Sequence, residues 1–416
     1  MSIGSVFVKI LAPVFTIFFL MLGNGFFLSF VSLHLDHLGH SEGVIGSIHA
    51  LYYAGLLIGA WRADHHILKV GHIRAYAAFC AIGTACFLVQ ALTFDIWVWG
   101  LTRFIMGFCV AVYYVVVESW FLSEASDQTR GSILSVYMAV LYLSQAASQY
   151  LLPYLDLSSA QPYLYAAILS ILSQVPLTLT SAPAPHIHEG SRRTLTSLLR
   201  RSPFGFAGCV LAGVILSAIY SFVPLFATAV HLSVPGLVST CILGGVILQW
   251  PLGHLSDIID RRLVLLGVSV GTALPALAIV YGYPSVQLTY LLIFLLGGFA
   301  FTLYPLSITQ VCDRLQANDI TKATGVLLLA YGIGAVVGPI LAPVCIHSFQ
   351  PGGLFIFITG VTALLSIVGV WTIYFKPPIP LEDQADYVPL PPAATPFAYD
   401  LDPRAPEMDS SPEGSS

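Results

Sequence analysis

Twelve long apolar blocks set the strongest limit on what this chain can fold into. An α-helix needs roughly 20 apolar residues to cross the hydrocarbon core of a membrane. Blocks of that length lie at residues 10–33, 43–61, 75–93, 97–121, 132–152, 160–181, 205–229, 234–254, 263–282, 286–311, 324–346 and 353–375. Only 9% of the 416 residues are charged, against about 25% in a typical soluble domain. The pattern predicts an all-α polytopic membrane protein with twelve transmembrane helices.

The basic residues all fall on one side of this pattern. If the N-terminus lies in the cytoplasm, every Lys and Arg except Arg103 falls in a cytoplasmic segment. Lys and Arg concentrate in the cytoplasmic loops of membrane proteins. We therefore expect both termini in the cytoplasm. A miscounted block would place basic residues on both sides, so the partition also supports the count of twelve.

A polar linker divides six blocks from six. Residues 182–204 combine Pro, His, Gly and Ser with two pairs of arginines. We expect an N-terminal six-helix bundle at 1–181 and a C-terminal six-helix bundle at 205–375. Residues 376–416 are acidic and Pro-rich without apolar periodicity, which predicts a disordered cytoplasmic tail.

The two halves show a weak internal repeat. A shift of 190 residues pairs Phe104 with Phe294, Gly107 with Gly297, and Tyr114 with Tyr304. A shift of 193 residues pairs Asp64 with Asp257, each at the expected cytoplasmic end of a half's second block. Internal repeats are typical of transporter folds, in which the pathway runs between the repeats. The repeat predicts two pseudo-symmetric bundles.

The fourth block carries a polar stripe. Arg103, Gly107, Ala111, Tyr114 and Glu118 fall within about 80° of one helix face at 100° per residue. A charge inside the membrane costs about 2.5–3.5 kcal/mol on insertion scales and commonly marks a functional site. Arg103 is a candidate for binding an anionic group or for biasing a neighbouring proton site, or else it is a snorkelling or carbonyl-bonding arginine. Glu118 is a candidate proton-coupling carboxylate, or else an interfacial acid at a helix end.

Uncharged polar residues are candidates for lining a pathway, although each alone is more often an interhelical hydrogen bond. They are Asn24, His49, Tyr53, Tyr142, Gln145, Gln149, Tyr220, Ser221 and Gln249, together with Tyr304 on the tenth block's matching stripe. As a set they suit a mostly neutral substrate that forms hydrogen bonds or stacks on aromatic rings. Histidines crowd residues 34–42, where metal capture is a weaker reading than a polar loop because no ligand spacing is matched.

A short motif after the eighth block points to a family. Gly253, Asp257, Arg261 and Arg262 lie in the segment GHLSDIIDRR, which resembles the loop motif of the major facilitator superfamily. Arg103-x-x-x-Gly107 is similar to that family's fourth-helix motif. The segments around residues 117–119 and 303–305 resemble the YcaD-like group of bacterial permeases.

The resemblance implies a secondary active transporter of the bacterial inner membrane that moves a small solute by alternating access. It favours coupling to protons, with facilitated diffusion as the alternative. It also implies that Gly253, Asp257, Arg261 and Arg262, with Asp64 in the first half, form a cytoplasmic gate. We expect a monomer in contact with membrane lipids. The alternative is a transporter-like membrane sensor or scaffold that signals through the cytoplasmic tail.

Several other classes lack support in the sequence. There is no Walker-type nucleotide motif and no catalytic constellation, so we expect neither direct use of ATP nor an enzyme. The seven cysteines show no paired spacing, so we expect no metal site and no disulfide framework. No cofactor and no nucleic-acid partner is expected.

Overall fold

The computed structural model describes residues 3–126, 128–179, 202–282, 285–315, 317–380, 382, 384 and 387–388. For residues 3–9 and 317–322 it describes the backbone alone. The helices in these residues are α1 (Ile3–His37), α2 (Glu42–Val70), α3 (His72–Leu92), α4 (Ile96–Ser123), α5 (Arg130–Ser148), η1 (Gln149–Tyr154), α6 (Gln161–Leu179), α8 (Pro203–Ala229), α9 (Val234–Ile258), α10 (Arg261–Tyr281), α11 (Val286–Cys312), α12 (Ala317–Ser348) and α13 (Gly353–Phe375). Most of the predicted linker and tail lies outside the described residues.

The prediction of twelve spans is confirmed. Within the described residues, 12 helices are long and apolar enough to cross a membrane. Several extend beyond the apolar blocks, because helical hydrogen bonding continues where lipid ends. The block 43–61, for example, is the core of α2, which runs from Glu42 to Val70.

Side-chain caps begin several helices after short connections. Asp95 precedes α4, and its carboxylate accepts from the backbone N–H groups of Trp97 and Val98 at 2.9 and 3.0 Å. Such a cap satisfies donors that the first helical turn leaves without partners. The three residues between α3 and α4 therefore suffice to reverse the chain.

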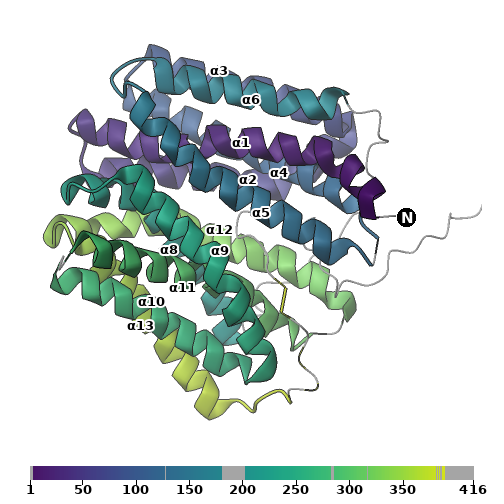
Figure 1. Cartoon of the computed structure of the whole chain (residues 1–416), viewed down its shortest axis with the longest axis vertical. Helices are drawn as coiled ribbons and strands as arrows, with labels where there is room; N and C mark the ends of the chain where they lie inside the picture. Colours follow the sequence, from purple (N-terminus) through teal and green to yellow (C-terminus); the bar gives the residue numbers. More distant parts are fainter. Residues whose placement is uncertain are drawn as a thin grey trace, which may run out of the picture.

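The helices form two groups of six (Figure 1): α1–α6 in purple to blue, and α8–α13 in green to yellow. Equivalent glycines bring equivalent helices together. A methyl group at Gly107 would overlap the carbonyl of Tyr52, so α4 approaches α2 closely. A methyl group at Gly297 would overlap the carbonyl of Cys241, so α11 approaches α9 in the same way. The predicted pairing of Gly107 with Gly297 thus has a physical basis in small-residue helix packing.

The two ends of the bundle differ in charge. We call one the arginine-rich end; it carries Arg62, Arg74, Arg130, Arg261, Arg262 and Arg314. The connections at the opposite end, between α1 and α2, α3 and α4, η1 and α6, α8 and α9, α10 and α11, and α12 and α13, contain no Lys or Arg. That the arginine-rich end faces the cytoplasm stays a prediction.

The halves contact each other near the opposite end. Gly46 of α2 lies against the carbonyl of Pro339 in α12. Ser32 Oγ of α1 donates to the carbonyl O of Ser221 in α8 at 2.7 Å. Ser239 Oγ of α9 donates to the carbonyl O of Ala146 in α5 at 2.7 Å. These contacts hold the opposite end closed.

Candidate functional site

A cavity separates the halves at the arginine-rich end. It has a volume of about 510 Å³ and lies between α5 and α9. Its walls include Met138 and Tyr142 from α5 and Gln249, Trp250 and His254 from α9. The cavity lies between one helix of each half. We call it the interface cavity.

Aromatic rings from both halves pack next to Tyr142, which lines the interface cavity. The ring of Phe301 on α11 lies 5.7 Å from that of Tyr142 and 5.8 Å from that of Tyr220. The Tyr220 hydroxyl donates to Oε1 of Gln145 at 3.2 Å, across the two halves. The structure therefore brings together two of the residues that the sequence proposed for the pathway. Tyr304, fully buried, packs on Tyr331 with ring centroids 4.7 Å apart.

Arg103 lies buried inside the first half. Its side chain has no exposed surface, and none of its three nitrogens has a hydrogen-bond partner among the described residues. The guanidinium carbon instead lies 4.4 Å from the centre of the Tyr52 ring and 5.8 Å from that of Phe27. Cation–π contact offsets part of the cost of burial. Neither alternative to a functional Arg103, snorkelling or carbonyl bonding, describes this geometry.

His49 lies within electrostatic range of Arg103 and carries a vacant acceptor. Ser32 Oγ donates its one proton to the carbonyl O of Ser221, so it accepts from His49 Nε2 at 2.8 Å. This arrangement assigns the proton to Nε2 and leaves His49 Nδ1 as an acceptor with no partner in the described part of the chain. The Tyr53 hydroxyl nearby is likewise without one.

We call His49, Tyr53 and Arg103 the buried polar layer. Leaving a buried polar group without a hydrogen bond costs about 1–3 kcal/mol. A group that offers an acceptor to Arg103 and a donor to His49 Nδ1 would satisfy the layer. Water or the polar part of a solute has both functions.

Two other residues of the predicted pathway lie close to this layer. Asn24 Nδ2 donates to the hydroxyl of Tyr52 at 3.0 Å, and the Arg103 guanidinium lies over the ring of the same tyrosine. Tyr114 is buried, and its hydroxyl contacts Met21 Sδ at 3.4 Å. Arg103, Asn24 and Tyr114 thus face the same interior of the first half.

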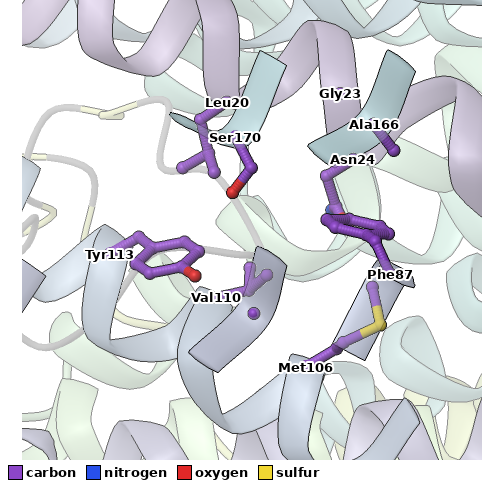
Figure 2. Close-up of a pocket in the computed structure, with 10 residues that line it drawn as sticks. Leu20, Gly23, Asn24, Phe87, Met106, Val110, Tyr113, Ala166 and Ser170 are labelled. Atoms are coloured by element: carbon purple, nitrogen blue, oxygen red, sulfur yellow. The ribbon is translucent and has the colours of Figure 1, made fainter. Parts of the chain in front are cut away.

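A small cavity beside Asn24 lies inside the first half. Figure 2 shows Tyr113 and Phe87 among the residues around it, together with Leu20, Met106 and Ser170. Its volume is about 10 Å³, close to the minimum of about 10–15 Å³ that one water molecule requires. This cavity is too small for a metabolite, so the interface cavity is the better candidate for a solute.

Glu118 is fully buried rather than exposed at a helix end. It lies in the last third of α4, and the Tyr137 hydroxyl of α5 donates to its Oε1 at 2.6 Å. This hydrogen bond joins α4 to α5.

Both ends of the Gln149 side-chain amide form hydrogen bonds to α1. Its Oε1 accepts from Ser29 Oγ at 2.7 Å, and its Nε2 donates to the carbonyl O of Gly25 at 3.0 Å. Both partners belong to α1. The amide therefore fastens α1 to the start of η1, and its hydrogen-bonding capacity is largely used.

The proposed gate motif forms a charge network at the arginine-rich end. Arg261 Nη1 contacts both carboxylate oxygens of Asp313 at 2.5 and 2.6 Å, and its Nη2 donates to Asp257 at 3.0 Å. Arg261 thereby joins the ends of α9, α10 and α11. Asp313 was missed in the sequence, although an acid directly after the last apolar residue of the tenth block is a usable signal.

Arg262 forms the second part of this network. Its Nη2 donates to Asp260 Oδ2 at 2.6 Å. Burial alone would raise the pKa of the Asp260 carboxyl, but the hydrogen bonds from Arg262 and the charges of Arg262 and Arg314 hold that pKa below its usual value. Asp260 therefore stays ionised at neutral pH. Asp64, the predicted counterpart in the first half, lies in α2.

The crowded histidines at the opposite end do not form a metal site in the described residues, which contain no group of three or more His, Cys, Asp or Glu side chains suited to a metal ion. His34 stacks on Trp99 with ring centroids 5.6 Å apart. Its Nδ1 lies 2.8 Å from the carbonyl O of Leu157. This histidine therefore packs as a core residue.

Gly46→Val tests the closed end. Overpacking of this kind costs about 1–3 kcal/mol, and here it would act on the contact between α2 and α12. We expect opening of the opposite end, measured as a longer distance between spin labels at Ser41→Cys and Phe349→Cys. Gly43→Val, one turn earlier where only Ser41 lies within 4 Å of an added Cβ, is the matched control. Equal distances in the two variants would contradict the closed-end assignment.

Comparisons with known proteins agree on one family. The family model of the Major Facilitator Superfamily matches residues 14–247 and 233–398 of the chain. An uncharacterized MFS-type transporter of Yersinia pestis (strain Pestoides F) is 29% identical over 336 residues, covering 80% of this chain and 87% of the relative. The uncharacterized MFS-type transporter YcaD of Escherichia fergusonii is 27% identical over 339 residues, with the same coverage.

A solved structure shares the fold. The crystal structure of a mutant of the nucleoside transporter NupG superposes with a TM-score of 0.73 at 17% identity, covering 88% of this chain and 100% of that chain. The unmutated protein gives a TM-score of 0.70. The sequence resemblance to this superfamily and to its YcaD-like group is confirmed, as is the twelve-helix fold.

Proposed function

The chain belongs to the Major Facilitator Superfamily and is a multi-pass transporter of the bacterial inner membrane, and we propose that it moves a small solute by alternating access, coupled to protons. The observation that carries the proposal is the asymmetry of the interface between the halves. They are in contact at the opposite end and separated by the interface cavity at the arginine-rich end. With basic residues on the cytoplasmic side, this conformation is inward-facing.

We propose that the buried polar layer forms the part of the pathway that leads toward the opposite end. His49 Nε2 is hydrogen-bonded to Ser32 Oγ, and Ser32 Oγ donates to the carbonyl O of Ser221 in α8 across the closed interface. Opening the opposite end would break the Ser32–Ser221 bond and bring solution to His49 and Arg103. A solute with an acceptor group would then replace the missing partners of Arg103. Rotation of the halves would carry it toward Tyr142, Tyr220 and the interface cavity.

The aromatic and amide lining favours a solute with a planar ring and several hydrogen-bonding groups. Nucleosides have both features, and NupG, whose structure is similar, is a nucleoside transporter. They are therefore the first solutes to screen. Thermal stabilisation detects binding whatever the direction of transport, because a ligand that binds the native state stabilises it by mass action.

Glu118→Gln tests proton coupling. We propose that Glu118 gains and loses a proton as its bond to Tyr137 breaks and forms. The glutamine keeps the size and a hydrogen bond but carries no charge, so solute-driven proton uptake should fall to background. Purified protein in liposomes with an internal pH-sensitive dye measures this uptake.

The same vesicles distinguish coupling from transport. Solute exchange between equal concentrations on both sides should persist in Glu118→Gln if only the proton step is lost. Glu124→Gln, a nearby acid at the C-cap of α4, is the matched control and should take up protons normally. Proton uptake in Glu118→Gln at the wild-type rate would eliminate this residue as the coupling site.

A further inference from the structure

The segment after α13 lies against the arginine-rich end. Arg262 Nη1 donates to the carbonyl O of Lys376 at 2.8 Å, and Arg314 Nη2 donates to that of Pro377 at 3.3 Å. Further along, the backbone N–H of Tyr387 donates to Asp257 Oδ1 at 2.8 Å. Two charged groups of the proposed gate, together with Arg314, therefore bind the main chain of this segment. These hydrogen bonds involve described residues of the segment 376–416; the prediction of a disordered tail stays a prediction, because most of that segment lies outside the described residues.

Tyr387 and Val388 line the interface cavity. The ring of Tyr387 lies on Gly253 of α9 so closely that a methyl group at Gly253 would overlap ring atoms. Val388 is only 6% exposed. Both residues line the same cavity as Leu134 and Met138 of α5. The pair therefore shares this cavity with α5 and α9, and we call it the docked pair.

The cavity also contains polar groups that suit a ligand. Gln249 Nε2 and the Tyr142 hydroxyl have no hydrogen-bond partner in the described structure, and their side chains are 4% and 3% exposed. Tyr142 lies within electrostatic range of Tyr387. Gln249, Tyr142 and the docked pair line the same cavity.

We propose that residues 387–388 are an autoinhibitory latch, a segment of this chain bound between α5 and α9 that keeps the arginine-rich end from closing and obstructs the cavity. Closure brings α5 and α9 together, and the docked pair occupies the space into which they would move. The proposal rests on the alternating access proposed above. It adds an occupant for the cavity and a step, release of the latch, before each cycle.

The chemistry of the latch explains its selectivity for this end. Residues 380–388 contain Glu382, Asp383 and Asp386 and no Lys or Arg, and the end at which Tyr387 and Val388 lie is rich in arginine. Gly253 supplies the flat surface for the Tyr387 ring. Asp257 supplies the acceptor for its N–H. The motif glycine and aspartate therefore have a binding role in addition to the gate role that the resemblance implies.

Docking is tested by the reactivity of a thiol on the latch. Val388→Cys is made in the full chain with Cys345→Ser; the other six cysteines are buried. In detergent, a maleimide should modify Val388→Cys at least about tenfold more slowly in the native than in the denatured protein. Gly253→Ala, which displaces the ring, should remove most of this protection, since hydrogen bonding to charged Asp257 then weakens as well. Gly267→Ala, a helical glycine with nothing within 4 Å of an added Cβ, should leave it unchanged.

Inhibition is tested by the distance across the cavity. Spin labels at Ser135→Cys and Trp250→Cys report on α5 and α9. Deleting residues 381–416, or Tyr387→Ala alone, should add a population with a shorter distance, because the end is then free to close. Gly253→Ala should have the same effect in the full chain and no further effect in the Tyr387→Ala background.

Two results would overturn the latch: native reactivity of Val388→Cys equal to that of the denatured protein, or distances that do not change when the latch is removed. Neither measurement needs a transported solute. A failed flux assay would therefore count against the proposed function and not against the latch.

Discussion

Replacing Arg103 with leucine is expected to lower transport by about 10- to 100-fold and to leave the protein as stable as the wild type, or more stable. A hydrogen bond to a charged group contributes about 1.5–3 kcal/mol, which a solute or water would lose in the leucine variant. The free protein loses no hydrogen bond, because none of the Arg103 nitrogens has a partner in the described residues. It also no longer buries a charge at a cost of about 2.5–3.5 kcal/mol.

The opposite signs of the two effects separate a functional arginine from a structural one. Flux is measured in proteoliposomes, and stability as the melting temperature in detergent without solute. Arg103→Lys keeps the charge but not the planar group over Tyr52, so we expect intermediate flux. Arg62→Leu, which removes an arginine at the arginine-rich end of α2, is the matched control for charge. A large loss of stability in Arg103→Leu would show that the arginine is structural.

Arg261→Ala is expected to destabilise the second half by about 3–5 kcal/mol, the usual cost of removing one partner from a buried ion pair. The side chains of Arg261 and Asp313 are 1% and 2% exposed, so water does not replace the lost interaction. The melting temperature of the variant should fall by several degrees. The ends of α9, α10 and α11 should also exchange amide hydrogen faster, because Arg261 joins them.

A double-mutant cycle separates the pair from its surroundings. Arg261→Ala/Asp313→Ala should lose much less stability than the two single variants added together, because the double variant leaves neither charge of the pair behind. Additive losses would show that Arg261 and Asp313 act independently. Replacing Asp257, which is 24% exposed in its bond to Arg261, should cost less than replacing Asp313, since solvent screens that bond.

Both predictions involve contacts that the sequence did not reveal. The motif identified Arg261 and Asp257, which lie four residues apart across a helix junction. Its third member, Asp313, comes from another helix and has no fixed spacing to them. Arg103 stood out because charge is rare inside a membrane segment, but its isolation from hydrogen-bond acceptors was not predictable. That isolation depends on how Tyr52 and Phe27, on two other helices, pack around it.

The sequence alone determined the number of membrane-spanning helices, the division into two repeats and the family. These follow from local constraints: a lipid core of fixed thickness requires about 20 apolar residues per helix and satisfies no backbone groups. The tertiary structure alone decided which end of the interface is closed, where Arg261 finds its second carboxylate and where Tyr387 docks. Those features arise from contacts between helices far apart in the chain, which leave no periodic pattern in the sequence.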